Sequence, residues 1–388
     1  MGAESASAGD ALDPEPCLSG VSHMHAKPIT PTRTDVLRGW TVPGALLSLI
    51  LLLAGCGEEY PQSSINPHSD FAEIIHSLYV SIFWWTMLIL AVVWVLLAYV
   101  LVKFRARPGD PKPKQIRGHM GLEIGWTVGP ALIVVAIAIP TIQAVFATQR
   151  PLSEDALMVE VTGHQFWWEF HYPEEGVTTA NELRLPVDRP VSLRLGSTDV
   201  IHSFWVPKLG GKRDVNPVVA VPDGQEPKYN WLFFTPNQTG LYMGQCAEFC
   251  GEAHAFMAMR VLVETEDEFQ GWIQEWQALA PPDEDPRVAL GQDIFLNQST
   301  CVACHAIEGT SAVGLLGPNL TLFGQRTTLA AGIRENNQEN LVSWIRDPHG
   351  MKPGAAMPGT TYPGGNWPAT NLSDDQVEAV AAYLLSLK

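Results

Sequence analysis

Two long apolar runs without a charged residue limit what this chain can fold into. The runs from Ile74 to Val102 and from Ile124 to Gln149 contain no Asp, Glu, Lys or Arg. Each is longer than the roughly 20 residues that a helix needs to cross a bilayer. The segment between them is rich in Lys and Arg, which the positive-inside rule assigns to the cytoplasm. We therefore expect transmembrane helices at 71–103 and 121–148, with the rest of the chain after them outside the cytoplasm.

A third, shorter apolar run lies nearer the N-terminus and has the features of a secretory signal. It extends from Thr41 to Ala54, follows several basic residues, and ends in Leu-Ala-Gly-Cys56, which resembles a bacterial lipobox. We expect residues 1–55 to be a leader and Cys56 to be lipidated. The alternative is a signal or anchor that contains a cysteine by chance. The stretch before this run is long for a leader, so the true start could be Met24.

Charge and cysteine usage narrow the function. The net charge of -17 excludes a general nucleic-acid binder, which would normally be basic. The six cysteines could form three disulfides in an exported chain, but four of them lie in two tight clusters, Cys246 with Cys250 and Cys301 with Cys304. This clustering is typical of cofactor binding.

The sequence pattern of the part expected outside the cytoplasm changes twice. Short alternating apolar segments at 157–161, 191–195 and 231–234, separated by turn residues, predict an all-β sandwich or barrel that ends near Glu264. A Pro- and acid-rich stretch then reads as a linker, and helical patterning follows it. We expect a multi-domain membrane protein: a two-helix hairpin, a cupredoxin-like Greek-key β-sandwich at 150–280, a linker at 281–286, and a small all-α domain at 287–388.

The segment from Cys246 to Met257 carries the strongest chemical signal. It holds two thiols, an imidazole and a thioether within twelve positions, in the order Cys246, Cys250, His254 and Met257. Soft sulfur ligands with imidazole favour copper, zinc or iron–sulfur clusters, and zinc more commonly uses Cys and His alone. A mononuclear blue-copper site needs one Cys, so two suggest sulfurs that bridge a pair of copper ions. The missing ligand must then come from an upstream strand, where His202 is the best candidate.

These segments resemble subunit II of cytochrome c oxidase, over both membrane runs and the whole β region. The resemblance implies a dinuclear CuA centre whose ligands are His202, Cys246, Cys250, His254, Met257 and the backbone carbonyl of Glu248. It also implies that the Glu248 carboxylate helps to hold a magnesium ion at the border with subunit I. The alternatives are a disulfide between the two cysteines and a core role for Met257.

Two further segments carry the resemblance. Glu123 lies where the family has a carboxylate at the entrance of a proton pathway into subunit I, and the alternative is an ordinary helix-end carboxylate. The aromatic stretch after His164 resembles the one beside CuA. Family members that accept electrons from soluble cytochrome c generally have Trp where this chain has Phe166. Trp167, Trp168 and His164 could equally be structural.

The second cysteine cluster reads Cys301-Val-Ala-Cys304-His305, the attachment signature of haem c. The thiols would form thioethers with the haem vinyl groups and His305 would ligate the iron. Met357 lies in a Met-Pro loop that resembles the distal loop of small cytochromes c, and Met351 and His349 are the alternatives.

The resemblance as a whole is to a subunit II with a C-terminally fused cytochrome c domain, as in bacterial caa3-type oxidases. It implies an electron-input subunit, without a catalytic residue of its own, that passes electrons from haem c to CuA and on to the oxygen-reducing site of subunit I. The expected partners are subunit I, subunit III, a cytochrome c or an upstream respiratory complex, and the bacterial inner membrane, with both redox domains on the periplasmic side. The alternative is a membrane-tethered copper and haem carrier without an oxidase partner.

Overall fold

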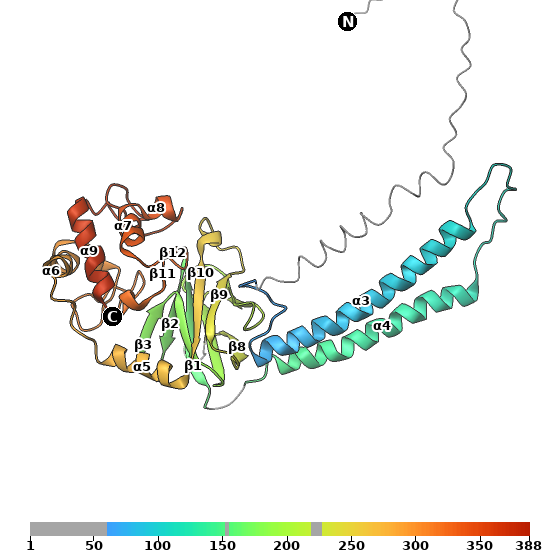
Figure 1. Ribbon diagram of the computed structural model, residues 1–388, viewed down its shortest axis with the longest axis horizontal. Coiled ribbons are helices and arrows are strands. Elements are labelled where there is room, and N and C mark those ends of the chain that lie inside the picture. The colour runs from blue at the N-terminus through green and yellow to red at the C-terminus, as the bar shows by residue number, and fades with distance from the viewer. Residues whose placement is uncertain (1–59, 152–154, 219–226) are drawn as a thin grey trace, which may run out of the picture. The chain divides into compact units, whose positions relative to one another are not determined.

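The computed structural model describes residues 60–151, 155–218 and 227–388. The expected leader and Cys56 lie outside the described residues. Within them the chain forms a pair of long helices, a β-sandwich and a C-terminal helical domain (Figure 1). The fold class expected from the sequence is confirmed.

The helix pair consists of α3 (Asp70–Lys103) and α4 (Met120–Ala147), which lie side by side in Figure 1. Both helices are long and apolar enough to cross a membrane. The Ser69 hydroxyl accepts a hydrogen bond from the Ala72 N–H, which satisfies a backbone donor at the start of α3. Most of their large apolar side chains are exposed, as expected of a surface that meets lipid.

The β domain is a sandwich of two five-stranded sheets. One sheet has the order β3-β2-β1-β5-β8 and the other β4-β10-β9-β6-β7. The strands are β1 (Leu157–His164), β2 (Trp167–Tyr172), β3 (Val177–Ala180), β4 (Glu182–Pro186), β5 (Val191–Ser197), β6 (His202–Trp205), β7 (Arg213–Val215), β8 (Asn230–Phe234), β9 (Gly240–Cys246) and β10 (Ala258–Glu264). The segments predicted as strands from their alternation are β1, β5 and β8.

The core of the sandwich follows from that alternation. Along β1 every second residue is buried, and β2 has the same period with Trp168 and Phe170 fully buried. Helix α5 (Glu266–Gln277) begins with a capping box between Thr265 and Glu268 and buries four large apolar side chains in the same core. This helix follows the last strand, β10, and therefore belongs to the β domain.

The C-terminal domain has its own core, built mainly from α6 (Pro286–Asp293), α7 (Gln338–Arg346) and α9 (Asp374–Ser386). A capping box between Ser373 and Gln376 starts α9. Helix α6 crosses α9 so closely that a Cβ on Gly291 would lie 1.9 Å from the Ala379 carbonyl oxygen. Only glycine fits at this crossing. Shorter elements connect the helices: a π turn (Ile294–Gln298), 3-10 turns (Cys301–Ala303 and Phe323–Gln325), β11 (Thr328–Leu329), β12 (Arg334–Glu335) and α8 (Pro348–Met351).

Candidate metal centre and haem cavity

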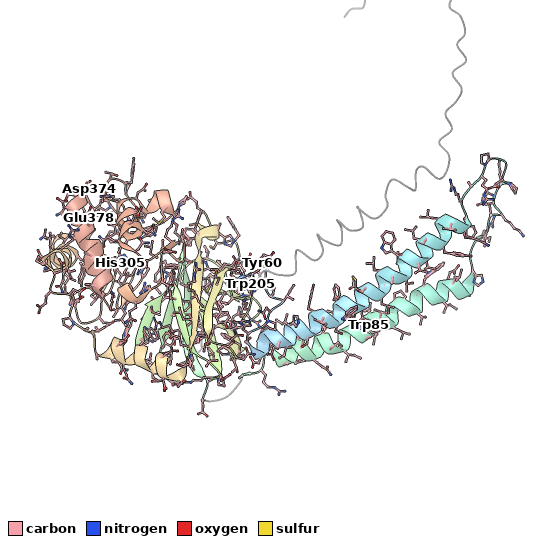
Figure 2. The ribbon with its side chains drawn as sticks, in the orientation of Figure 1. Tyr60, Trp85, Trp205, His305, Asp374 and Glu378 are labelled. Atoms are coloured by element: carbon pink, nitrogen blue, oxygen red, sulfur yellow. The ribbon has the colours of Figure 1, made fainter. Side chains whose placement is uncertain are left out.

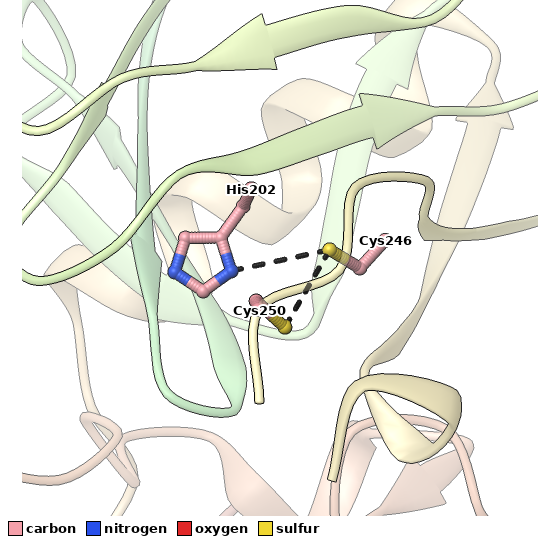
Figure 3. Close-up of side chains that lie close together, drawn as sticks. All are labelled: His202, Cys246 and Cys250. Atoms are coloured by element: carbon pink, nitrogen blue, oxygen red, sulfur yellow. Dashed lines mark hydrogen bonds between the residues drawn. The ribbon is translucent and has the colours of Figure 1, made fainter. Parts of the chain in front are cut away.

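The sandwich brings the predicted copper ligands together at one end. His202 opens β6 and Cys246 ends β9, and these strands pair next to each other. Cys246 Sγ lies 3.9 Å from His202 Nδ1 and 3.9 Å from Cys250 Sγ (Figure 3). All three side chains are buried. The upstream histidine chosen from the sequence is thus adjacent to the cysteine loop.

The rest of the donor set comes from the loop after β9. Cys250 Sγ lies 3.7 Å from His254 Nδ1 and 3.9 Å from Met257 Sδ. The Glu248 carbonyl oxygen lies 3.2 Å from Cys246 Sγ, whereas the Glu248 side chain belongs to an exposed residue. Every donor that the resemblance implies therefore lies in one cluster.

The spacing of the sulfurs fits metal binding. A disulfide needs sulfurs about 2.05 Å apart, so at 3.9 Å the cysteines are not bonded. Metal–sulfur bonds are about 2.3 Å long, so both sulfurs can reach the same ion. Thiolate, imidazole and thioether together are a copper-type donor set. The residues present thus fit a copper centre.

The two thiols are electrostatically coupled. The hydrogen bond from the Cys250 thiol stabilises the Cys246 thiolate and, despite burial, lowers the pKa of Cys246 to about 3. The same hydrogen bond, together with burial, raises the pKa of Cys250. The pair therefore retains a proton that a metal must displace on binding.

Asp199 orients the histidine ligand, and sequence analysis did not identify it. His202 Nε2 donates to Asp199 Oδ1 at 2.8 Å, which leaves Nδ1 directed at the sulfurs. Burial opposes ionisation of Asp199, but hydrogen bonds from His202, Val200 and Gln165 outweigh it and lower its pKa. Burial likewise disfavours a charge on His202, but the hydrogen bonds and charges of Asp199 and Cys246 together outweigh it and raise the pKa of the imidazole. The carboxylate thus fixes the ring of the ligand.

We expect Asp199→Asn to weaken copper binding by about 10- to 100-fold, the usual effect of losing such a supporting partner. The change removes the charge that holds the imidazole while it keeps the shape of the side chain. Chelator competition on the purified chain measures the affinity. Asp267→Asn, at an exposed position on α5, removes the same charge away from the site and should leave the affinity unchanged. Equal affinities for both variants would contradict a role for Asp199.

The C-terminal domain contains a cavity of about 210 Å³ that holds the predicted haem ligands. Cys301, Cys304 and His305 lie on its wall with Met357, and His305 is labelled in Figure 2. His305 Nδ1 donates to the Pro318 carbonyl at 2.8 Å, which leaves Nε2 free to face an iron ion. The remaining wall is largely apolar: Leu316, Leu320, Phe323, Leu329, Leu341, Trp344, Ile345, Val380 and Leu384. These residues fit a covalently bound haem.

The cavity distinguishes between the possible distal ligands. Met357 lines it, whereas the described residues Met351 and His349 are absent from its wall. Met351 and Met357 both pack against the core of the C-terminal domain, so the cavity wall is what distinguishes them. The geometry therefore favours Met357.

The β domain supplies part of the same cavity wall. Gln165 and Phe166, from the turn between β1 and β2, and Trp167, which opens β2, line it beside the haem residues. Gln165 Nε2 donates to the Cys250 carbonyl at 2.6 Å, so this turn contacts the cysteine loop as well. Trp167 stacks on His164 at 4.1 Å, whereas Trp168 lies in the sandwich core. The turn therefore joins the haem cavity to the copper ligands, which the sequence did not indicate.

Comparison with known proteins places the chain in a family. Three family models match: the transmembrane domain of cytochrome c oxidase subunit II over residues 62–144, its periplasmic domain over 175–265, and cytochrome c over 288–388. Cytochrome c oxidase subunit 2 of Alkalihalophilus pseudofirmus is 36% identical over 346 residues, 88% of this chain and 95% of the relative. This chain belongs to the cytochrome c oxidase subunit II family. It is a subunit of an oxidoreductase complex and carries a fused cytochrome c domain, which fits the caa3 type.

Other relatives and one solved domain are similar to most or part of this chain. Cytochrome c oxidase subunit 2 of Bacillus subtilis is 37% identical over 88% of this chain and 96% of its own length. Quinol oxidase subunit 2 of Bacillus cereus is 32% identical and covers 62% of this chain and 82% of its own length. Among solved structures, the periplasmic domain of subunit II from Bradyrhizobium japonicum is 29% identical, with a TM-score of 0.28, over 31% of this chain and 94% of that domain. The matches to the subunit II and cytochrome c families imply copper in the β domain and haem in the C-terminal domain.

The carboxylate predicted to mark a proton pathway lies at the start of α4. Glu123 Oε1 accepts a hydrogen bond from the His119 N–H at 3.2 Å, so the side chain contributes to capping the helix. The residue is exposed in this chain. Glu123 therefore has a local structural role in capping the helix. Its other carboxylate oxygen does not take part in this hydrogen bond.

Proposed function

We propose that this chain is the electron-input subunit of a respiratory haem–copper oxidase, with electrons passing from haem c to CuA and on to the oxygen-reducing site of subunit I. The observation that carries the proposal is the shared wall: residues 165–167 line the haem cavity, and Gln165 donates to the carbonyl of Cys250. Bound haem and copper supply one-electron chemistry. The protein's part is to hold their ligands and to exclude water from the space between them.

The site residues follow from the clusters described above. CuA ligands are assigned to the side chains of His202, Cys246, Cys250, His254 and Met257, together with the carbonyl of Glu248. Haem c is assigned to the thiols of Cys301 and Cys304, with His305 and Met357 as axial ligands. The buried thiols favour a dry, rigid site, and the apolar cavity excludes water from the haem.

The remaining assignments concern the membrane and subunit I. The exposed carboxylate of Glu248 is available for a magnesium ion shared with subunit I, and Glu123 for a proton pathway into that subunit. Helices α3 and α4 would anchor the subunit in the bacterial inner membrane as a hairpin, with the redox domains on the periplasmic side. Subunit III and a cytochrome c or upstream complex complete the expected set of partners. Lipidation of Cys56 stays a prediction.

The test is a single-turnover experiment on the purified oxidase. Haem c is reduced by a light-activated donor, and the optical signals of haem c and CuA are followed in time. We expect haem c to be oxidised as CuA is reduced, at a rate that does not depend on protein concentration, because donor and acceptor share one chain. If CuA is reduced while haem c stays reduced, the proposed order is wrong.

A further inference from the structure

The loop that carries the predicted distal haem ligand touches the β domain at two points. Lys352, five positions before Met357, donates from Nζ to the Phe166 carbonyl at 2.6 Å. Gly354 has a φ of +83°, and a Cβ at this position would lie 3.1 Å from the Glu252 Cβ. Glu252 belongs to the copper-ligand loop. The haem-ligand loop is therefore in direct contact with the copper side.

Lys352 is an unusual residue for such a contact. It is only 4% exposed, and it also donates to the Ala330 carbonyl at 3.2 Å. None of the ion pairs among the described residues involves it. Burial lowers the pKa of the Lys352 amine to about 7, so its position depends on hydrogen bonds to the carbonyl acceptors and not on an ion pair. One of these acceptors belongs to each domain.

Other polar contacts surround this point and give the interface one orientation. The Glu182 carboxylate, in a residue 4% exposed, accepts hydrogen bonds from the N–H and hydroxyl groups of Thr327 and Thr328, at 2.7 to 3.1 Å. Arg260, in β10, donates to the Gly332 carbonyl at 2.9 Å. Buried hydrogen bonds are directional, and a shifted interface would leave their partners unpaired.

We infer that Lys352 is a positioning residue that holds the haem-ligand loop against the copper-ligand loop and thereby sets the rate of electron transfer between them. The inference rests on the proposed order from haem c to CuA. The Lys352 amine donates to two carbonyl groups. One is that of Phe166, in the turn next to both sites, and the other is that of Ala330, in the haem domain. Without that bridge the two domains remain tethered but lose a fixed mutual orientation.

The test uses Lys352→Met in the purified oxidase, because methionine keeps the length of the side chain and removes its donors. We expect amide hydrogen exchange at residues 328–332, on the haem side of the interface, to rise by about tenfold, the effect of losing a hydrogen bond from a charged donor. Because Lys352 also lines the haem cavity, the reduction potentials of both centres are measured in the same samples. The rate of electron transfer from haem c to CuA should fall by more than the change in these potentials accounts for. Arg287→Met, at an exposed position on α6, removes a cationic side chain from the same domain and is the matched control.

A second variant covers the possibility that Lys352→Met fails to attach haem. Glu182→Gln weakens the same interface from the β domain, and Glu182 itself is not among the residues that line the haem cavity. We expect it to increase exchange at 328–332 and to slow the same electron transfer. The inference is overturned if folded Lys352→Met keeps both the wild-type exchange at 328–332 and the wild-type rate of electron transfer. If Lys352→Met does not fold, wild-type exchange and a wild-type transfer rate in Glu182→Gln overturn it instead. If the wild type transfers no electron from haem c to CuA, the proposed function fails, whereas the exchange measurement still decides whether Lys352 holds the interface.

Discussion

Cys246→Ser is expected to abolish the copper centre and with it oxygen consumption by the oxidase. The Cys246 sulfur lies within 3.9 Å of both the His202 ring and the Cys250 sulfur, so its loss removes the donor common to both. Loss of a residue that only supports a metal ligand typically lowers the metal affinity by about 10- to 100-fold, and loss of a ligand should lower it further. Copper content per covalent haem, electron paramagnetic resonance and oxygen uptake measure the effect.

The control for this variant lies in the same loop. Ala247→Ser adds a hydroxyl group next to the ligand without removing a sulfur, and it should keep the copper content of the wild type. Covalent haem should remain in both variants, because the C-terminal domain has a separate core. A Cys246→Ser chain with full copper content and an unchanged spectrum would show that this sulfur is not a ligand.

The second large effect is expected for Cys301→Ala combined with Cys304→Ala. Without thioether bonds the haem is lost, and the apolar cavity of about 210 Å³ is left empty. At ~24 cal/mol per Å³ an empty cavity costs about 5 kcal/mol, which is comparable to the whole stability of a small domain. We therefore expect the C-terminal domain to lose its protection from hydrogen exchange along α9.

The measurements separate the two domains. Haem staining after denaturing electrophoresis reports covalent attachment, and hydrogen exchange reports the folding of α9 and of the sandwich. The sandwich should keep its protection and its copper, because its core is distinct from that of the C-terminal domain. Wild-type protection of α9 in a haem-free chain would show that the haem is not part of this core.

The parts of the fold that sequence analysis predicted are those set by local pattern. The uncharged runs predicted the helix pair, and period-two alternation predicted β1, β5 and β8. The copper loop could also be predicted from the sequence, because most of its donors lie within twelve consecutive positions. His202 was found only because the chemistry of the loop required one more ligand.

The supporting residues could not be predicted in the same way. Glu182 and Thr327 are 145 positions apart, and Lys352 and Phe166 are 186 apart, so no periodicity relates them. Asp199 lies three residues before His202, but an acidic residue in a loop before a strand is too common to stand out. The contacts of such residues form only when the folded domains pack against each other, and the local sequence pattern of each domain does not encode that packing.

The short connection between α5 and α6 gives the docked interface a further consequence. Pro286 follows Gln277 by nine positions, which limits the separation of these ends to about 30 Å even when the chain is extended. A tether of this kind keeps the detached domain at an effective concentration on the order of millimolar around its own acceptor. Loss of the interface would therefore slow the internal transfer without making it depend on enzyme concentration. The covalent link thus keeps each haem domain with its own acceptor, while the buried polar contacts fix its orientation there.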